Sequence, residues 1–407
     1  MVELLRETRL PYAKLEVLHT VLAEIKSTLE NVNPHEEMSI EEAAKTLKQK
    51  SKVEVPFPPE VPPPNAKLMM KMEPPSRMNV VGSFPLKYAA RTRHGYNLDM
   101  IVEMPAELFQ KQDNINYRYF YKRAYYLAAL AAQLRGSPLG KMLDIRFHPL
   151  RGDQKRPVLL ITALPTSPSS YNFADTGATI RILPSLSMDA IQTTRLLPSR
   201  SGVRVGYLES PNYIPTADTS QELLPTPIYN ALILEDMLFT AHLAYVHRVI
   251  QDCPGFADAC ILAKVWLSQR GYHSTHPTTR QFTSFNWAML LAYLVQVGGG
   301  PNGARLLSRQ FTPYQLFRGT LHFIGTHDFA KEPLSFVSDL PNLAEFQSHS
   351  AAVIVDPSGK LNLFQGLSQP ELLHLQHEAR QAVQWLDDPR CDHFFALFLT
   401  PVQDGAL

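Results

Sequence analysis

The chain has 407 residues, 45% of them hydrophobic, and its 39 basic and 38 acidic side chains leave a net charge of +1. This length allows two or three domains with cores of their own, and the near-neutral charge excludes the overall positive field by which many proteins attract nucleic acid. Cys253, Cys260 and Cys391 show no CxxC spacing, so the sequence predicts neither a zinc ribbon nor a disulfide framework and fits a reducing compartment.

The first 76 residues are predicted to form N-terminal helices and a connector. Apolar residues at helical spacing predict a helix over 12–29, and Ser39, with a glutamate three residues later, opens a second helix over 40–49. Six prolines between Pro56 and Pro64 then predict an extended, polyproline-like connector rather than a folded segment.

Residues 77–215 are predicted to form an α/β domain, because short apolar runs alternate with helical patterns and with turn-forming residues. A long helix is expected over 114–134, and the run over 86–93 also has a helix-like pattern. Strands are expected over 78–81, 98–103, 143–147, 158–163, 178–183 and 202–207.

Residues 216–335 are predicted to form a mainly helical domain, and residues 336–407 a hairpin, a helix and a strand that we interpret as the start of a further module. The helices of the first part are expected over 227–243, 256–270 and 284–296. In the second part the hairpin joins 351–355 to 361–364, the helix covers 369–386 and the apolar strand covers 394–399.

Gly82-Ser83 and the strand that follows carry a pattern suited to phosphate chemistry. The turn exposes backbone N–H groups that could hold a phosphate, although a plain strand-to-helix turn gives the same pattern. Asn97 and Asp99 lie two residues apart and point to one face of a strand, where two carboxylates could share a pair of metal ions. The first position is asparagine, so the pair is broken. The best candidate strand for a third carboxylate offers Arg181, a cation that would repel metal and could pair with Asp99.

This layout resembles the polymerase-beta-like nucleotidyltransferase superfamily, in which a Gly-Ser turn and a helix precede a strand with two carboxylates. The resemblance implies that Asn97, Asp99 and Arg181 stand at degenerate catalytic positions. It also implies that Gly82 and Ser83 are vestigial phosphate contacts.

A second resemblance lies further along the chain, in the sequence CPGFADACILAKVWLSQRGY over 253–272. It predicts a helix that ends at Gly271 and is similar to the helix that follows the catalytic domain in poly(A) polymerases and oligoadenylate synthetases. In those enzymes a lysine of this helix reaches the nucleotide triphosphate, and Lys264 matches that position. The alternative interpretation of Lys264 is a lysine that extends along an amphipathic helix to solvent. The sequence SFNWAMLLAYL over 284–294 is similar to the next helix. Together the two resemblances imply an α+β fold, with a nucleotidyltransferase-like α/β domain followed by a helical domain of the poly(A) polymerase and oligoadenylate synthetase type.

The narrowest resemblance is to the Nrap family of nucleolar RNA-associated proteins, and it covers residues 80–400. It is carried by GSFPLKYAARTRHGYNLDMIVEMP, TPIYNALILEDM, GFADACILAKVWLSQRGY and DPSGKLNLFQGLS. Members belong to the small-subunit processome and contain tandem nucleotidyltransferase-like and helical modules that have lost activity. The resemblance therefore implies a nucleolar protein without a cofactor, whose partners are pre-ribosomal RNA, small nucleolar ribonucleoprotein and other processome proteins. Because members are much longer, this chain would hold the first module and the opening of the next.

No secretory signal or membrane partner is expected. The N-terminus is charged and amphipathic, unlike a signal peptide, and no apolar run reaches the ~18 residues that cross a bilayer.

Two basic segments are candidates for RNA contact, with a solvated helix face or an ordinary turn as the alternative interpretations. On the tyrosine-rich helix, bases could stack on aromatic rings while Arg118 and Lys122, which are four residues apart and share a face, meet phosphates. The sequence RFHPLRGDQKRP over 146–157 is the densest basic loop and could touch an RNA backbone. Its basic residues are Arg146, Arg151, Lys155 and Arg156.

The leading hypothesis is a non-catalytic nucleotidyltransferase-like scaffold that binds pre-ribosomal RNA and partner proteins in small-subunit biogenesis. One alternative is an active, magnesium-dependent RNA nucleotidyltransferase in which Glu103 or Asp144 supplies a missing carboxylate. Another is a platform for proteins alone, without salt-dependent RNA binding. No metal site is expected, because the histidines at 273 and 276 have no acidic or cysteine partner at ligand spacing.

Overall fold

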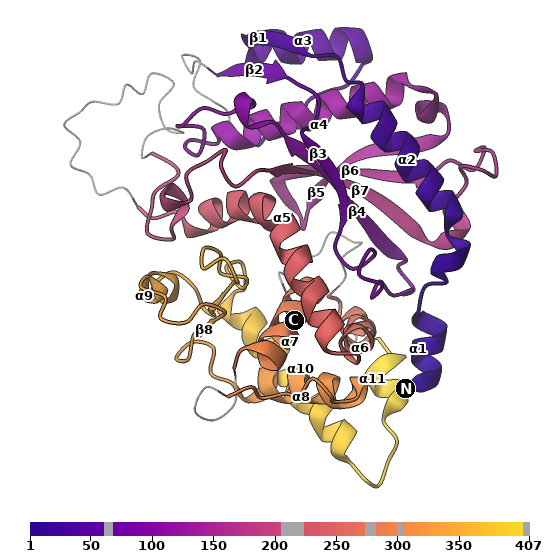
Figure 1. The fold of residues 1–407 in the computed structure, drawn as a ribbon, viewed down its shortest axis with the longest axis vertical. Helices are drawn as coiled ribbons and strands as arrows, with labels where there is room; N and C mark the ends of the chain where they lie inside the picture. The colour runs from indigo at the N-terminus through magenta and orange to yellow at the C-terminus, as the bar shows by residue number, and fades with distance from the viewer. Residues whose placement is uncertain (61–67, 205–223, 273–281, 299–303, 402–407) are drawn as a thin grey trace. The chain divides into compact units, whose positions relative to one another are not determined.

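The computed structural model describes residues 1–60, 68–204, 224–272, 282–298 and 304–401 (Figure 1). Their Cα positions group into two compact units. The sheet unit comprises Pro11–Val81 and Leu98–Phe239, and the helical unit comprises Met1–Leu10, Gly82–Asn97 and Thr240–Leu407. Within the described ranges, none of the helices combines the length and apolarity that a membrane crossing requires. The chain has a mixed α+β fold, as predicted.

A five-stranded sheet in the order β3-β4-β7-β6-β5 forms the centre of the sheet unit. β3 pairs antiparallel with β4, placing Val81 opposite Asp99, and β6 pairs antiparallel with both β5 and β7. The buried helix α4 packs against β6, and α2 and α3 pack against α4. The strands are β3 (Arg77–Val81), β4 (Tyr96–Met104), β5 (Leu143–Leu150), β6 (Asp153–Ala163) and β7 (Ala178–Leu186), and the helices are α2 (Glu16–Glu30), α3 (Ile40–Ser51) and α4 (Arg118–Gly136).

The predicted Pro-rich connector contains a strand that the sequence analysis missed. β2 (Met69–Met72) pairs antiparallel with β1 (His35–Ser39). Met70 and Met72 are buried while the residues beside them are half-buried, so this short segment has the alternation of a strand despite the prolines before it. The predicted N-cap of α3, the helix that follows β1, is confirmed, since the Ser39 side chain accepts a hydrogen bond from the Glu42 N–H at 3.2 Å.

One large core holds the helical unit together. The Trp266 and Trp287 rings lie 5.9 Å apart at its centre, and apolar side chains from the N-terminal helix, residues 86–90 and all the long C-terminal helices pack around them. The helices are α1 (Val2–Thr8), α6 (Phe256–Gln269), α7 (Ser284–Gln296), α8 (Pro313–Thr326), α10 (Gln369–Asp387) and α11 (Phe394–Phe398).

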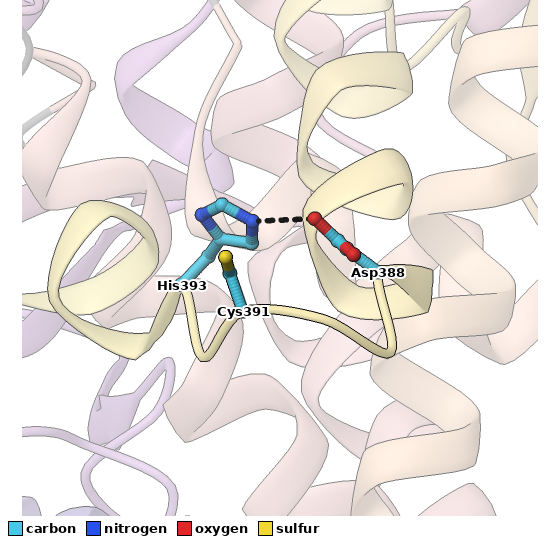
Figure 2. A group of neighbouring side chains, drawn as sticks. All are labelled: Asp388, Cys391 and His393. Atoms are coloured by element: carbon cyan, nitrogen blue, oxygen red, sulfur yellow. Dashed lines mark hydrogen bonds and ion pairs between the residues drawn. The ribbon is translucent and has the colours of Figure 1, made fainter.

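The remaining elements are short or connect the larger ones. The long helix α5 (Pro227–Asp252) begins in the sheet unit and ends in the helical unit. β8 (Leu334–Ser335) and β9 (Ile354–Val355) form a two-stranded parallel sheet beside α9 (Leu343–Gln347). Six residues connect α10 to α11, and Asp388, Cys391 and His393 lie close together in this connection (Figure 2). The 3-10 helices are Tyr12–Lys14, Ala106–Leu108, Pro138–Lys141, Ala174–Thr176 and Thr193–Leu196.

Four sequence predictions of local structure need correction. Residues 86–93 form turns and isolated bridges instead of a helix, because Pro85 and the left-handed Lys87 (φ 57°) bend the chain. The apolar run 394–399 is the helix α11, not a strand. Residues 202–204 form no strand, and 205–207 lie outside the described residues. Instead of a regular hairpin, β9 pairs with β8 and meets the segment after the turn at one bridge.

The domain boundaries predicted at residues 76, 215 and 335 stay predictions. Side chains of α10 and α11 pack in the same core as those of α6, α7 and α8, so residues on both sides of the boundary predicted at 335 share one core.

Candidate functional site

Asp99 and Arg181 form an ion pair across two neighbouring strands of the sheet unit. The Arg181 Nε donates to Asp99 Oδ1 at 2.6 Å, and its Nη2 donates to Oδ2 at 2.8 Å. The two side chains are only 15% and 21% exposed. β4 and β7 are adjacent in the sheet, which places the two residues side by side although they are 82 positions apart in sequence. The pairing predicted from the sequence is therefore present.

This ion pair opposes metal binding at Asp99. A two-metal site needs carboxylate oxygens that converge on the cations, whereas both Asp99 oxygens accept hydrogen bonds from a fixed positive charge. The residue two positions earlier on β4 is Asn97, whose neutral amide adds no charge to attract a cation.

The two carboxylates proposed as alternatives do not join Asp99. Glu103 is four residues further along β4, roughly 13 Å away at the rise of a strand, and accepts a hydrogen bond from the Ser76 hydroxyl at 2.9 Å. Asp144 lies on β5, which two strands separate from β4, so it is roughly 14 Å away across the sheet. Its Oδ2 is bound by Arg146 Nε at 2.7 Å.

Ser83 and Lys264, two of the phosphate-contact candidates, meet within the helical unit. The Lys264 Nζ, on α6, donates to the Ser83 Oγ at 2.6 Å and lies 5.2 Å from the centre of the Tyr88 ring. Gly82 has φ 77°, a left-handed conformation that suits glycine and forms the turn before Ser83. The structure therefore brings together residues that are 181 positions apart and that carry the two separate sequence resemblances.

Arg118 and Lys122 share a helix face, as predicted, but this face is turned toward a buried carboxylate. Arg118 Nε donates to Asp113 Oδ1 at 3.0 Å, and Lys122 Nζ donates to Oδ2 at 2.7 Å. The Asp113 side chain is fully buried, so the two cations offset the cost of removing that charge from water. The neighbouring tyrosines at 119, 121, 125 and 126 are also buried and offer no exposed stacking surface.

The predicted basic loop consists mainly of strands β5 and β6 and the tight turn between them. Arg146 is 76% exposed and pairs with Asp144, while Lys155 Nζ lies 3.1 Å from Asp153. Arg151 adopts a left-handed conformation in the turn, with φ 51°, and its Nη2 lies 3.3 Å from a carboxylate oxygen of Glu235. Each of these cations thus has an acidic partner.

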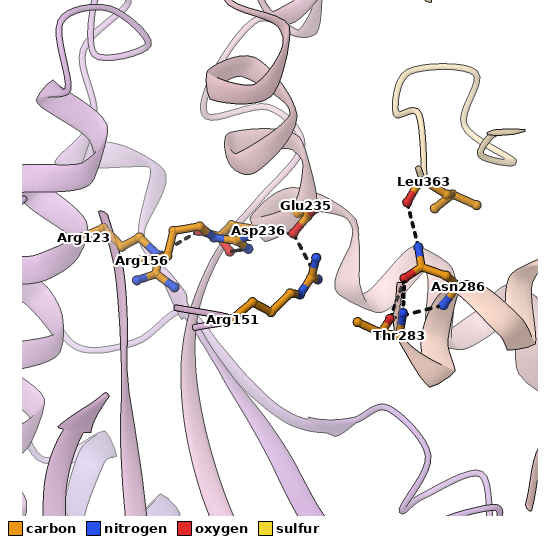
Figure 3. A network of polar contacts seen from close by, with 8 residues as sticks. All are labelled: Arg123, Arg151, Arg156, Glu235, Asp236, Thr283, Asn286 and Leu363. Carbon is orange, nitrogen blue, oxygen red and sulfur yellow. Dashed lines mark hydrogen bonds and ion pairs between the residues drawn. The ribbon is translucent and has the colours of Figure 1, made fainter. Parts of the chain in front are cut away.

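Arg156, the fourth cation of this segment, belongs to the interior of the sheet unit (Figure 3). It is 2% exposed and donates to Glu235 at 2.5 Å and to Asp236 Oδ1 at 2.6 Å. Burial would lower the pKa of its guanidinium, but the two carboxylates outweigh burial and raise it. Asp236 Oδ2 also accepts from Arg123 Nε at 2.7 Å and from the Tyr119 hydroxyl at 2.9 Å. The burial of Arg156 and its bonds to Glu235 and Asp236 argue against the predicted RNA contact, which stays a prediction.

Sequence reasoning missed Asp236 and its partner Arg123. A signal was present, because Glu235-Asp236 interrupts the apolar run ALILEDMLF in the middle of a predicted helix. Charges inside an apolar run are buried only when they are paired.

A second network in Figure 3 fixes the start of α7 in the helical unit. The Thr283 Oγ1 accepts from the Asn286 N–H at 3.3 Å, and the Asn286 Oδ1 accepts from the Thr283 N–H at 2.8 Å, which is a capping box. The Asn286 Nδ2 also donates to the Leu363 carbonyl at 2.7 Å. The histidines at 273 and 276 lie outside the described residues.

The fold resembles that of a known RNA-modifying enzyme. A solved structure of the Cid1 poly(U) polymerase with MgGTP bound matches with a TM-score of 0.54, covering 98% of this chain and 97% of that one. The two sequences are only 10% identical, so the match shows a nucleotidyltransferase-type fold and nothing about activity.

Sequence relatives and family comparisons agree with each other. "Nucleolar protein 6" of Mus musculus is 33% identical over 406 residues, and "U3 small nucleolar RNA-associated protein 22" of Saccharomyces cerevisiae is 28% identical over 420. Each match covers 98% of this chain, which spans only about a third of the length of these relatives (32% and 33%). Residues 37–252 match Nrap protein domain 1, and residues 255–401 match the Nrap protein PAP/OAS-like domain. The chain therefore belongs to the Nrap family.

Proposed function

We propose that this chain is a non-catalytic, nucleotidyltransferase-like scaffold of a nucleolar protein, and that it binds pre-ribosomal RNA and partner proteins during processing of ribosomal RNA in small-subunit biogenesis. The observation that carries the proposal is the Arg181 guanidinium, which binds both oxygens of Asp99. A sheet that can no longer hold catalytic metal ions can still bind RNA or partner proteins through its surface.

The names of the relatives support the setting of this function. One is named a nucleolar protein and another a protein associated with U3 small nucleolar RNA, and this chain aligns with both over 98% of its length. We therefore place the chain in the nucleolus, with small nucleolar ribonucleoprotein and other small-subunit processome proteins as its partners.

Gly82, Ser83 and Lys264 are proposed to be vestigial phosphate contacts that no longer hold a nucleotide. Because the Lys264 ammonium lies over the Tyr88 ring and donates to Ser83, the protein itself supplies partners that a phosphate would otherwise provide. No cofactor is needed for the scaffold function.

Magnesium-dependent incorporation of radiolabelled nucleotide into RNA tests the loss of catalysis. We expect no incorporation by the wild-type chain or by Asp99→Ala. Incorporation that Asp99→Ala abolishes would overturn the proposal, because it would show a working carboxylate site around Asp99.

RNA binding by the same samples, measured over a series of salt concentrations, tests the second half of the proposal. Binding that weakens as salt rises supports the RNA-binding scaffold, because phosphate contacts release counterions. The pairing of every candidate cation with a carboxylate favours a second function, a platform for proteins alone. The absence of any salt-sensitive RNA binding would select that alternative.

A further inference from the structure

The connection between α10 and α11 gathers three side chains with different metal-binding atoms. Asp388, Cys391 and His393 offer a carboxylate oxygen, a thiol sulfur and an imidazole nitrogen, and these atoms all lie within 4.8 Å of one another (Figure 2). All three belong to one six-residue connection in the helical unit.

The distances suit a small tetrahedral ion. The His393 Nε2 lies 3.1 Å from Asp388 Oδ2. Two nitrogen or oxygen ligands about 2.0–2.1 Å from a tetrahedral zinc ion are themselves about 3.3 Å apart, so these two atoms already have nearly the required spacing. Cys391 is exposed, and its sulfur lies within 4.8 Å of the other two ligand atoms.

Other contacts hold the imidazole and the carboxylate in place before any ion binds. The Trp385 ring stacks on His393, with 5.8 Å between ring centres and 20° between planes. The Asp388 Oδ1 accepts from the Arg390 N–H at 2.9 Å, which leaves Oδ2 directed at His393. Such supporting contacts orient ligands in established metal sites.

We propose that Asp388, Cys391 and His393 bind one zinc ion, with water at the fourth position. Thiolate, imidazole and carboxylate together favour zinc over magnesium or calcium, which prefer oxygen ligands. His393 binds through Nε2, whose proton moves to Nδ1, and Cys391 releases its proton to solvent. The Asp388 carboxylate and the Cys391 thiolate then balance the two positive charges of the ion, and the ion joins the end of α10 to the start of α11.

Cobalt titration of the full 407-residue chain, reduced, metal-free and without a histidine tag, tests the site. We expect one Co²⁺ per chain and the near-ultraviolet absorption of a thiolate–cobalt bond. Cys391→Ser should remove this absorption, and Asp388→Asn and His393→Asn should each weaken binding at least about tenfold. Asp392→Asn is the matched control, because asparagine still accepts the Phe394 N–H through Oδ1 as Asp392 does, and it should change nothing.

Alkylation followed by mass spectrometry provides a readout without substitutions. Cys391 is exposed and should react rapidly with iodoacetamide in the metal-free chain, whereas bound Zn²⁺ should slow its reaction. Cys253 and Cys260 are buried and serve as internal references. Equal reaction of Cys391 with and without Zn²⁺, or a thiolate–cobalt absorption that survives Cys391→Ser, would overturn the proposal.

Discussion

At the scale of single residues, the Asp99–Arg181 pair should contribute measurably to stability. Its side chains are mostly buried, so removing one partner leaves a charge with poor access to water. We expect Arg181→Gln to lower the free energy of unfolding by about 2 kcal/mol, between the values for exposed and fully buried pairs. Urea unfolding measures the change.

Arg146→Gln is the matched control for this experiment. Arg146 pairs with Asp144 on the same sheet but is 76% exposed, so its loss should cost less than about 1 kcal/mol. Equal losses for Arg146→Gln and Arg181→Gln would contradict the importance of burial at Asp99.

Asp356 should make stability depend on pH. Burial alone would raise the pKa of this carboxyl, but the hydrogen bonds from His242, Ser358 and the Leu361 N–H outweigh burial and lower it from its usual value. A carboxyl whose pKa is lower in the folded than in the unfolded state stabilises the fold at pH values above its unfolded-state pKa, which is near 3.9. This stabilisation is lost as the pH falls through the folded-state pKa. The difference in unfolding free energy between wild type and Asp356→Asn should therefore shrink as pH falls from about 5 to below 4.

Unfolding by urea at a series of pH values measures this difference. The exposed residue Asp339 of the same unit provides the comparison, because Asp339→Asn should cause only a small difference at any pH. A difference for Asp356→Asn that stays constant down to the lowest pH would contradict the predicted linkage.

At the scale of elements, Gly325 allows α8 and α10 to approach closely. A Cβ at this position would lie 2.8 Å from Arg380 Cγ and 3.3 Å from the Arg380 backbone nitrogen. Gly325→Ala should therefore destabilise the chain by about 1 kcal/mol, since a crowding cost of about 1–3 kcal/mol exceeds the gain of about 1 kcal/mol from replacing glycine in a helix. Thermal unfolding measures the change.

Gly136→Ala, at the end of α4, separates crowding from helix propensity. A Cβ at Gly136 would meet nothing within 4 Å, so the same substitution should be neutral or stabilising by up to about 1 kcal/mol. If Gly325→Ala also stabilised the chain, the two helices would not be in the tight contact described.

The predicted elements succeeded where the sequence pattern and the tertiary contacts agree. β3 to β7, α4, α6 and α7 follow apolar runs of the expected period. The run 394–399 is too short for its period to distinguish strand from helix, and it becomes α11 because Leu397 and Phe398 enter the helical core. β2 was missed because its pairing with β1 is a long-range contact that proline-rich flanks conceal.

At the scale of the whole molecule, we expect any RNA binding to depend only weakly on salt, because carboxylates already pair with the basic side chains that could contact phosphates. Of the six basic candidates, Arg146 has the most exposed side chain, and all six pair with carboxylates. If Arg146 meets a phosphate, Arg146→Gln should reduce the slope of log affinity against log salt by about 0.7. Lys122→Gln should leave the slope unchanged, because the Lys122 ammonium is bound by Asp113 and the Leu108 carbonyl.

Fluorescence anisotropy with a single-stranded RNA probe at several salt concentrations measures both slopes. A slope that changes with Lys122→Gln but not with Arg146→Gln would contradict this assignment and point to rearrangement of the buried ion pairs on binding.

Part of the candidate site was accessible from the sequence and part was not. The Asp99–Arg181 pair was predictable, because the apolar run 178–183 reads as a strand that carries Arg181, and β7 does lie beside β4 in the sheet. The basic sequence around Arg156 indicated RNA contact but gave no sign that Asp236 is its partner. Asp236 is 80 residues away in sequence, and only folding brings the two together. The exposure of a charged side chain depends on such distant contacts and cannot be read from local sequence.

The helical unit is built from segments that lie far apart in the sequence, and this affects the order in which the chain can fold during synthesis. Leu4 and Leu5 leave the ribosome before the sheet unit is complete, yet they pack in a core whose main segment begins at Thr240. At ordinary translation rates of roughly 5–20 residues per second, these leucines wait roughly 10–50 s for their partners, while the sheet unit is completed by Phe239 and is free to fold first. We therefore expect α1 to pack into the core of the helical unit only after the residues that follow Thr240 have been synthesised. Until then its apolar side chains are available to chaperones.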